Sequence, residues 1–558
     1  MRVAIKSLIK NFTPLDIYEK IFVLSICLIF IFFFIQNFVF SSSFDILLFR
    51  SVDDYAFQYS MRNIHEHMMQ LKIDKLFIAN DYGYGWVFWI IHSLITFPFY
   101  LISILGYDFL LISMARNISL LFMAGGCFLL FKISKKYTND KYIPYFIVLF
   151  FISYPFFAFS AMSFRTIAQC SFFCILAFYL TIRNDVLEKK DLKNLAITLS
   201  ACIGTKLSTA IIFPLIGMLL IDRYSFKINK ENIKKSIYFL VYLLFFSILF
   251  TNPSLFLSPF KHSLFNDYAS KMSYYLNQIK TNYGDGSSFL DNLINFFSSY
   301  LNKYLMVLCL IMLLAKAIFD IKYSKKNKFD FLYIFLFIIV SLIYIISTIK
   351  NGVNYIVNYF FSLSFLLLLS LIVLDNLSKK IKYTTLIVLL ILNIVFAVKN
   401  TSCISATYPF SINCHLQFFL KKHNENTKNL LESQKEMQNL VGDSKQKLNI
   451  LADYRAPMIY SGFNKNITVI SLFDNINIVR NYLSKDQYFD YILLHRDSIV
   501  MGNENDFNEK IKFASPDIKN NWIESRDIVN QLLKNNIFMD LEYQLIYDKN
   551  RLILFKKL

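Results

Sequence analysis

The chain has 558 residues, of which 56% are hydrophobic and 18% aromatic, and it contains 60 Phe but only 13 Gly and 10 Pro. This composition excludes a disordered or collagen-like chain and is typical of helices that face lipid. Subtracting 39 acidic from 58 basic residues leaves a net charge of +19, which in a soluble protein would indicate nucleic-acid binding.

The excess positive charge belongs to the apolar part of the chain. Residues 1–400 contain 38 basic and 21 acidic residues, a difference of +17, whereas residues 401–558 contain 20 and 18, a difference of +2. Lys and Arg in loops between apolar segments orient helices in a bilayer. We therefore expect membrane lipids, and no nucleic acid, as partners.

Segments long and apolar enough to cross a bilayer fill the first 400 residues, because a spanning helix needs about 20 mostly apolar residues. The first has an apolar run that is long for a signal peptide, and Phe38, Val39 and Phe40 occupy the place of small cleavage-site residues, so we expect it to remain as an anchor. The eleven expected spans are 20–40, 85–105, 109–131, 142–159, 164–182, 195–221, 237–257, 301–319, 331–349, 355–375 and 383–399.

The basic loops predict the orientation of the spans. The N-terminus and the loops 222–235, 320–330 and 379–382 are rich in Lys and Arg and share one side, which should be the cytoplasm. The loops 132–141 and 183–194 carry four basic residues each and fall on the opposite side. Either a span is miscounted between residues 84 and 182, or these two loops tolerate their charge.

Three soluble pieces are then expected together outside the cell membrane: the loops 41–84 and 258–300, and everything after residue 400. In the last piece, apolar runs shorten to strand length at 448–452, 467–472, 488–494, 541–547 and 551–555, with helix-like stretches at 474–484 and 519–536. We predict a multispanning catalytic domain over 1–400, a polar tether over 401–447 and a small extracytoplasmic α/β domain over 448–558.

Two adjacent carboxylates, Asp53 and Asp54, follow the first span. Mutual repulsion raises the proton affinity of one and leaves the other available as a base. Asp is also favoured at helix starts, and spacing alone favours a cap for the helix beginning near Tyr55.

A second motif, Asn80-Asp81-Tyr82-Gly83-Tyr84-Gly85-Trp86, leads into the second span. Asp81, Tyr82 and Tyr84 could present a carboxylate and ring faces to a sugar. For the aromatic side chains, an interfacial belt is the simpler interpretation.

Basic residues lie within or beside the apolar segments, where charges are costly enough to suggest function. Lys206 is expected near the middle of its span and Arg165 in a short break, while Lys261 lies in the second outer loop; a lipid phosphate would suit these cations. For Arg116, contact with a headgroup or an internal ion pair is the slightly preferred interpretation.

Metal and nucleotide sites are not indicated. His65 and His67 are separated by one residue and do not share a helix face, no zinc spacing occurs among the eight Cys, and no phosphate-binding glycine loop follows a strand. A divalent metal remains possible, but we expect no required cofactor.

The order of these motifs resembles that of the C-superfamily glycosyltransferases, which use polyprenyl-phosphate sugars. The resemblance is carried by Asp53-Asp54-Tyr55, the aromatic motif 82–89, Ala115-Arg116-Asn117, Tyr154-Pro155 and Gly204-Thr205-Lys206, over roughly residues 1–260. It implies a mostly helical membrane bundle and an acidic base in the first outer loop. Residues 160–170 lack the second carboxylate that such enzymes often carry, which leaves Asp81 as its substitute.

The resemblance implies inverting transfer of a sugar from a polyprenyl phosphate to a hydroxyl of an envelope glycan, lipid or protein, at the outer face of a bacterial inner membrane. Asp53 or Asp54 would be the base, and Arg165, Lys206 and Lys261 would hold the phosphate. Two alternatives are an O-antigen-type polymerase or ligase and a lipid or sugar transporter, although the internal repeats common among transporters do not occur.

Overall fold

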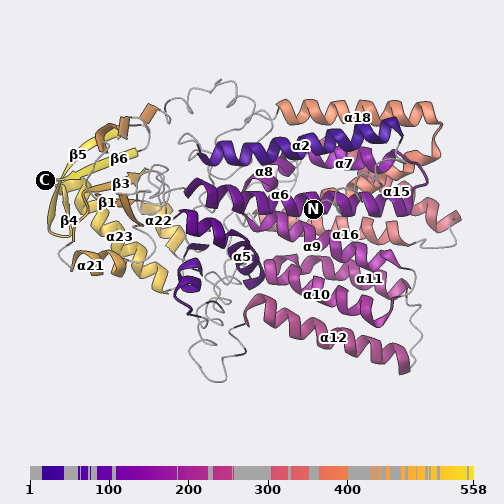
Figure 1. The fold of residues 1–558 in the computed structure, drawn as a ribbon, viewed down its shortest axis with the longest axis horizontal. Coiled ribbons are helices and arrows are strands. Elements are labelled where there is room, and N and C mark those ends of the chain that lie inside the picture. Colours follow the sequence, from indigo (N-terminus) through magenta and orange to yellow (C-terminus); the bar gives the residue numbers. More distant parts are fainter. Residues whose placement is uncertain are drawn as a thin grey trace.

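The computed structural model consists of a helical bundle and a small sheet domain beyond one end of it (Figure 1). The structure describes residues 16–42, 61–62, 64–72, 76, 85–103, 108–184, 187–223, 230–253, 256, 303–323, 329–350, 363–399, 429, 432–433, 436–437, 439–441, 448–452, 467–471, 476–484, 487–496, 501, 504–511, 516–549 and 552–558.

The helices of the bundle correspond closely to the apolar segments of the sequence. Five of those described are long and apolar enough to cross a membrane, and four more are apolar but shorter. The described helical elements of the bundle, in chain order, are α2 (Ile17–Ser42), α5 (Trp86–Ser103), α6 (Asp108–Tyr137), α7 (Ile143–Ser153), α8 (Pro155–Met162), α9 (Thr166–Arg183), α10 (Lys189–Thr205), η2 (Leu207–Ile212), α11 (Phe213–Arg223), α12 (Lys230–Thr251), α15 (Lys303–Tyr323), α16 (Asp330–Lys350), a helical run ending in η4 (Leu369–Asn376), and α18 (Lys379–Lys399).

Ion pairs gather many helix ends at the end of the bundle away from the sheet domain, which we call the ion-pair end. Lys141 pairs with Asp16 (2.6 Å) and Glu19 (3.2 Å) at the start of α2. Asp330, at the start of α16, accepts hydrogen bonds from Tyr137 of α6 (2.6 Å) and Arg223 of α11 (2.7 Å). These contacts determine the direction in which each of these helices runs.

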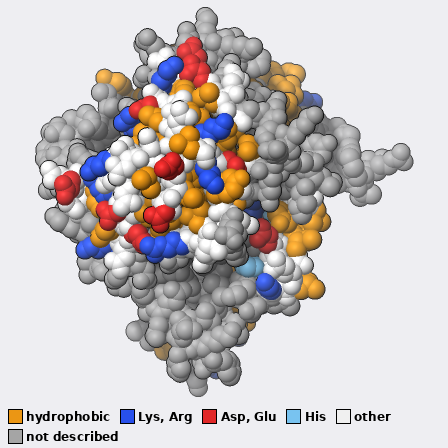
Figure 2. Space-filling view, turned by 90° about the vertical axis from the view of Figure 1, so that its left-hand side faces the viewer, with side chains coloured by type: hydrophobic (Ala, Val, Ile, Leu, Met, Phe, Trp, Pro, Cys, Tyr) orange, Lys and Arg blue, Asp and Glu red, His pale blue; other side chains and the backbone are white. Residues whose placement is uncertain are grey.

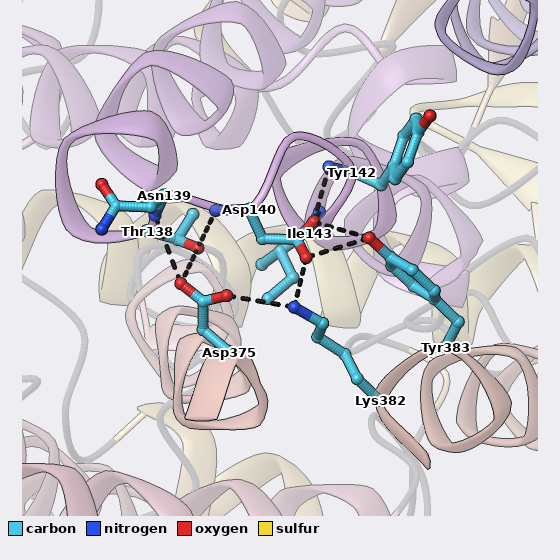
Figure 3. Close-up of polar contacts among 8 residues, drawn as sticks. All are labelled: Thr138, Asn139, Asp140, Tyr142, Ile143, Asp375, Lys382 and Tyr383. Carbon is cyan, nitrogen blue, oxygen red and sulfur yellow. Dashed lines mark hydrogen bonds and ion pairs between the residues drawn. The ribbon is translucent and has the colours of Figure 1, made fainter. Parts of the chain in front are cut away.

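A second group of contacts at this end joins the α6–α7 turn to η4 and α18 (Figure 3). Lys382 pairs with Asp140 and, at 3.1 Å, with Asp375. Thr138 donates to Asp375 (2.8 Å), and Tyr383 donates to Asp140 (2.9 Å). We call Asp140, Asp375 and Lys382 the clamp.

The contacts at the ion-pair end revise the expected topology. Lys136 donates to backbone oxygens of Ile182 and Arg183, and Arg183 pairs with Asp191 (2.6 Å). The loops 132–141 and 183–194 therefore lie at the same end as the other basic loops, and their apparent disagreement disappears. The disagreement arose from two errors in the expected spans, 85–105 and 195–221.

The expectation of a crossing over 85–105 is wrong. Helix α5 begins beside the end of α10, where the Gly85 N–H donates to the Thr205 carbonyl (3.2 Å), and it ends four residues before α6 starts. Both of its ends therefore lie toward the sheet domain. The expectation of one span over 195–221 is also wrong, because α10 runs toward the sheet domain and η2 with α11 runs back to the Arg223–Asp330 pair.

The expected span 142–159 is broken into α7 and α8 at Tyr154. Tyr154 has an extended backbone (φ −68°, ψ 136°) and precedes Pro155, the first residue of α8. Proline lacks an N–H and disfavours helical geometry in the residue before it, which explains the break at this position.

Side chains of α12 show how the bundle meets its surroundings. Ile237, Leu240, Val241 and Leu244 are each about half or more exposed. A helix whose exposed face is apolar is suited to hydrocarbon and would be costly in water. By contrast, basic, acidic and apolar side chains alternate over the sheet-domain end of the molecule, a composition typical of a water-exposed surface (Figure 2).

The C-terminal domain is built on a six-stranded mixed sheet with strand order β2-β1-β3-β6-β5-β4. Strands β1, β2 and β3 are parallel, and β6, β5 and β4 continue the sheet in antiparallel fashion. The elements are β1 (Leu448–Ala452), β2 (Ile467–Ser471), α21 (Ile476–Leu483), β3 (Tyr491–His495), α22 (Glu504–Ile511), α23 (Pro516–Asn535), β4 (Ile537–Phe538), β5 (Leu541–Lys549) and β6 (Leu552–Lys557).

Both faces of the sheet are covered. Val479 of α21 and Val529 of α23 pack with Ile492 on one face. On the other face, Met437 and Val441 pack against residues that include Ile450. Part of the segment before residue 448 therefore contributes to the core of the domain, as expected when central strands are buried on both sides.

The clamp gives the fold a defined pH dependence. Burial by itself raises the pKa of Asp140, but hydrogen bonds from Lys382, the Tyr142 N–H and Tyr383 outweigh burial and hold this pKa below its ordinary value of 3.8. A carboxyl with a lowered pKa stabilises the fold above its unfolded-state pKa, and this contribution is lost as the pH falls through its folded-state pKa.

We expect the Asp140→Asn variant to unfold at a lower temperature than the unsubstituted protein between pH 5 and 7. The difference should narrow below about pH 4, since acid then neutralises Asp140 in the unsubstituted protein as well. Thermal unfolding of the two proteins in detergent, from below pH 4 to pH 7, measures the difference and its narrowing. A difference that widens on acidification would contradict the assignment.

Candidate functional site

Three arginines are held around one buried cluster at the sheet-domain end of the bundle. The cluster consists of Met61, Ile64, Phe88, Trp89, Leu111, Ala115 and Phe164. Arg62, Arg116 and Arg165 each directly follow one of its members in the chain: Met61, Ala115 and Phe164, respectively. We call the seven buried residues, without the arginines, the aromatic cluster. It brings together basic residues from three separate segments of the sequence.

Lys206 joins the same region through the break between α10 and η2. Its backbone is extended (φ −159°, ψ 129°), and its carbonyl accepts hydrogen bonds from the Thr209 N–H (3.0 Å) and Oγ1 (2.8 Å), which begin the return passage. Next to it, Gln169 Nε2 donates to Thr205 Oγ1 (3.2 Å) and the Val87 carbonyl (3.5 Å). Val87 adjoins Phe88 of the aromatic cluster, so the chain at Lys206 lies beside the cluster whose members the three arginines follow in sequence.

Glycines allow the segments around Lys206 to approach closely. A Cβ on Gly85 would lie 2.1 Å from the Gly204 carbonyl oxygen, and one on Gly204 would lie 2.5 Å from Phe250 Cβ. Both contacts are too short for a real side chain. The beginning of α5 therefore packs directly on the backbone of α10, which in turn packs on α12.

His65 attaches the helical segment after Met61 to α5. Its Nε2 donates to the Ser93 carbonyl (3.0 Å) and lies 3.1 Å from Thr96 Oγ1. Burial lowers the pKa of His65 to about 4, so this imidazole is neutral at physiological pH. His65 thus has a positioning role, and no group of three metal-ligating side chains occurs in the described part of the chain.

The predicted site residues divide into two sets. Arg165 and Lys206 are described, and both border the same region. Asp53, Asp54, Asp81, Tyr82, Tyr84 and Lys261 lie outside the described residues. Arg62 was not among the predicted site residues, although the apolar pair Met61 and Ile64 beside it is the helical signal that could have identified it. Arg116, for which a headgroup contact or an internal ion pair is the slightly preferred interpretation from sequence, is only 2% exposed.

The arrangement is suited to a phosphate at a membrane boundary. Guanidinium groups form paired hydrogen bonds with phosphate oxygens, and an ammonium adds a compact positive charge. Arg116 and Lys206 are buried at 2% and 8% exposure. Charges so placed in a membrane bundle are expensive unless a functional or structural partner offsets them.

Comparison with known proteins identifies the fold. No family model and no curated protein sequence matches the chain. The structure of ArnT from Cupriavidus metallidurans bound to undecaprenyl phosphate matches with a TM-score of 0.57 and 10% sequence identity, covering 96% of this chain and 97% of that one. The likeness confirms the expected fold class at the level of architecture: a polytopic helical bundle with a small C-terminal sheet domain.

The glycine contact beside Lys206 can be tested with two matched substitutions. We expect Gly85→Ala to lower the thermal unfolding midpoint, because the new methyl group meets backbone that must shift, at a typical overpacking cost of about 1–3 kcal/mol. Gly217→Ala is the control, since nothing lies within 4 Å of a Cβ at this position of α11. Equal midpoints for the two variants would show that α5 does not depend on this contact.

Proposed function

We propose that the protein is an inverting glycosyltransferase that moves a sugar from a polyprenyl-phosphate donor to a hydroxyl group. The basic residues around the aromatic cluster are the observation that carries the proposal. In this proposal the sheet-domain end of the bundle lies at the membrane boundary, where a lipid phosphate would enter. The fold shared with ArnT, whose structure holds undecaprenyl phosphate, supports the same donor class here.

The donor phosphate would be bound by Arg165, Lys206 and Lys261, to which the structure adds Arg62 and Arg116 as candidates. Their positive charge would also stabilise the departing phosphate. A phosphate on a lipid is already a good leaving group, so the protein chiefly needs to position the reactants. The polyprenyl chain would remain among the apolar helix faces.

Asp53 and Asp54 are the proposed general base. They belong to the segment that joins Ser42, where α2 ends, to Met61 of the aromatic cluster. Both anchoring residues lie at the sheet-domain end. In this proposal one aspartate accepts the proton of the acceptor hydroxyl, and the freed oxygen attacks the anomeric carbon. The bond from that carbon to the phosphate oxygen breaks, and polyprenyl phosphate leaves with the electron pair.

Asp81, Tyr82 and Tyr84 are the proposed acceptor and sugar contacts. They immediately precede Gly85, which is fixed against α10 next to Lys206. Aromatic faces suit the C–H surfaces of sugar rings, and a carboxylate suits their hydroxyls. A glycan, a lipid or a protein of the cell envelope would supply the acceptor hydroxyl.

The proposed location is a bacterial inner membrane, with the N-terminus in the cytoplasm and the sheet domain outside. The basic loops support this orientation better in the observed topology than in the expected one. The loops 132–141 and 183–194 now join 222–235, 320–330 and 379–382 on one side, in agreement with the excess of Lys and Arg in cytoplasmic loops.

Removing a basic side chain near the aromatic cluster should weaken donor binding. We expect Lys206→Met and Arg116→Met each to raise the Kd for undecaprenyl phosphate about tenfold or more, because a charge-assisted hydrogen bond to phosphate contributes about 1.5–3 kcal/mol. Lys380→Met is the control, since Lys380 is exposed at the ion-pair end. Unchanged affinity in both site variants would refute the proposed phosphate site.

Removing the base should impair turnover more than binding. One of Asp53→Asn and Asp54→Asn, whichever removes the base, should transfer sugar about 10²–10⁴-fold more slowly than the unsubstituted protein. Its affinity for undecaprenyl phosphate should be nearly unchanged. The measurement compares glycans from cells with each variant and donor binding by the purified proteins. A polymerase or ligase would rest on Arg and His instead of an Asp pair. Full transfer by both variants, together with loss in Arg165→Ala or in His262→Ala of the second outer loop, would therefore favour that alternative.

A further inference from the structure

Two buried amides meet between α2 and α6, close to the basic residues. Asn37 and Asn117 are 0% and 2% exposed. Asn37 Nδ2 donates to Asn117 Oδ1 (2.9 Å) and to the Ala161 carbonyl of α8 (3.3 Å). The pair thus connects three helices inside the bundle.

The amide pair leaves hydrogen-bonding capacity unused. Asn37 Oδ1 and Asn117 Nδ2 have no partner in the described part of the chain, and the same holds for the hydroxyls of Ser160 and Ser163 on either side of Ala161. Both serines are at most 1% exposed. Leaving a buried amide or hydroxyl unbonded costs free energy, so this concentration of unused groups indicates a polar occupant.

The unused amide atoms define the chemistry of that occupant. One is an acceptor and the other a donor, and they belong to two amides already joined by a hydrogen bond. A hydroxyl group both donates and accepts, so it can bond to both atoms at once. Exchanging oxygen and nitrogen in both amides leaves the same combination, so this conclusion does not depend on how the amides are oriented.

The position of the pair relates it to the donor. Asn117 directly follows Arg116, and Ser163 directly precedes Phe164 of the aromatic cluster, which is followed by Arg165. Asn37 lies five residues before the end of α2 at Ser42. A lipid-linked sugar whose phosphate binds these arginines would bring hydroxyl groups into this neighbourhood, whereas the polyprenyl chain has no group that could bond to an amide.

We propose that Asn37 and Asn117, assisted by Ser160 and Ser163, bind one hydroxyl group of the transferred sugar and thereby select the donor. This inference rests on the proposed function. The amides are specificity-determining residues in it, distinct from the basic residues that hold the phosphate. An ordered water could satisfy the same two atoms, so the experiment must separate a sugar hydroxyl from water.

The test measures donor binding by the full-length protein in lipid nanodiscs. The probes are undecaprenyl phosphate itself, undecaprenyl phosphates carrying glucose, mannose, galactose or arabinose, and single-deoxy forms of the sugar that binds most tightly. The variants are Asn37→Leu and Asn117→Leu, with the milder Asn117→Ser in case leucine prevents folding. Asn393→Leu is the matched control: Asn393 is equally buried and its Oδ1 likewise has no partner in the described part of the chain, but it lies between α18 and α7, where it donates to Ser153 (2.5 Å).

For the unsubstituted protein we expect one sugar to tighten binding beyond undecaprenyl phosphate, and one deoxy form to lose about five- to fiftyfold in affinity. The Asn37 and Asn117 variants should lose the affinity that the sugar adds, and they should bind that deoxy form as tightly as its parent. Their affinity for undecaprenyl phosphate should persist, which also shows that they are folded. The Asn393 variant should retain the gain.

The inference is overturned if the Asn37 and Asn117 variants keep the full sugar-dependent gain, since the amides would then bind only water. It is also overturned if every deoxy donor binds as tightly as its parent. Failure of the unsubstituted protein to bind undecaprenyl phosphate at all would instead refute the proposed function. The two failures are therefore distinguishable.

Discussion

The ion pairs between helix ends opposite the sheet domain are the contacts on which the arrangement of the bundle depends. Charged groups at the edge of a membrane bundle are stable when each has a partner nearby. Lys382 with Asp140 and Asp375, and Arg223 with Asp330, bring distant segments of the chain to one end. At the other end, packing between α5 and α10 brings the turn at Lys206 beside the aromatic cluster, which includes Ala115 next to Arg116.

The break at Lys206 turns this arrangement into a candidate site. A single helix through 195–221 would have placed the ammonium group in the middle of the bilayer. Two shorter passages, α10 and then η2 with α11, place it at the sheet-domain end instead. Gly85 and Gly204 allow α5 to pack against this turn. In the proposed function, the basic residues bind the phosphate and Asn37 and Asn117 bind a hydroxyl group, so that two groups of residues share recognition of one lipid-linked sugar.

Much of the secondary structure could be predicted because it depends on local pattern. Strand-length apolar runs correspond to β1, β2, β3, β5 and β6, and apolar runs of about 20 residues correspond to most helices of the bundle. The two-residue strand β4 and the helix α22 are too short or too weakly patterned to be recognised. The hairpin between β4 and β5 has Met539 and Asp540 at positive φ (48° and 67°). Gly or Asn at these positions would have made the turn easier to predict from the sequence.

Hydrophobic length and the distribution of Lys and Arg by themselves determined that this chain is a membrane bundle followed by a small α/β domain, because both properties act locally along the sequence. The tertiary structure decided which apolar segments run between the two ends of the bundle. It also decided that Arg62, Arg116, Arg165 and Lys206 border one region and that Asn37 meets Asn117. These relations join residues up to 144 positions apart. They follow from packing between helices, which leaves no periodic signal in the sequence of either partner.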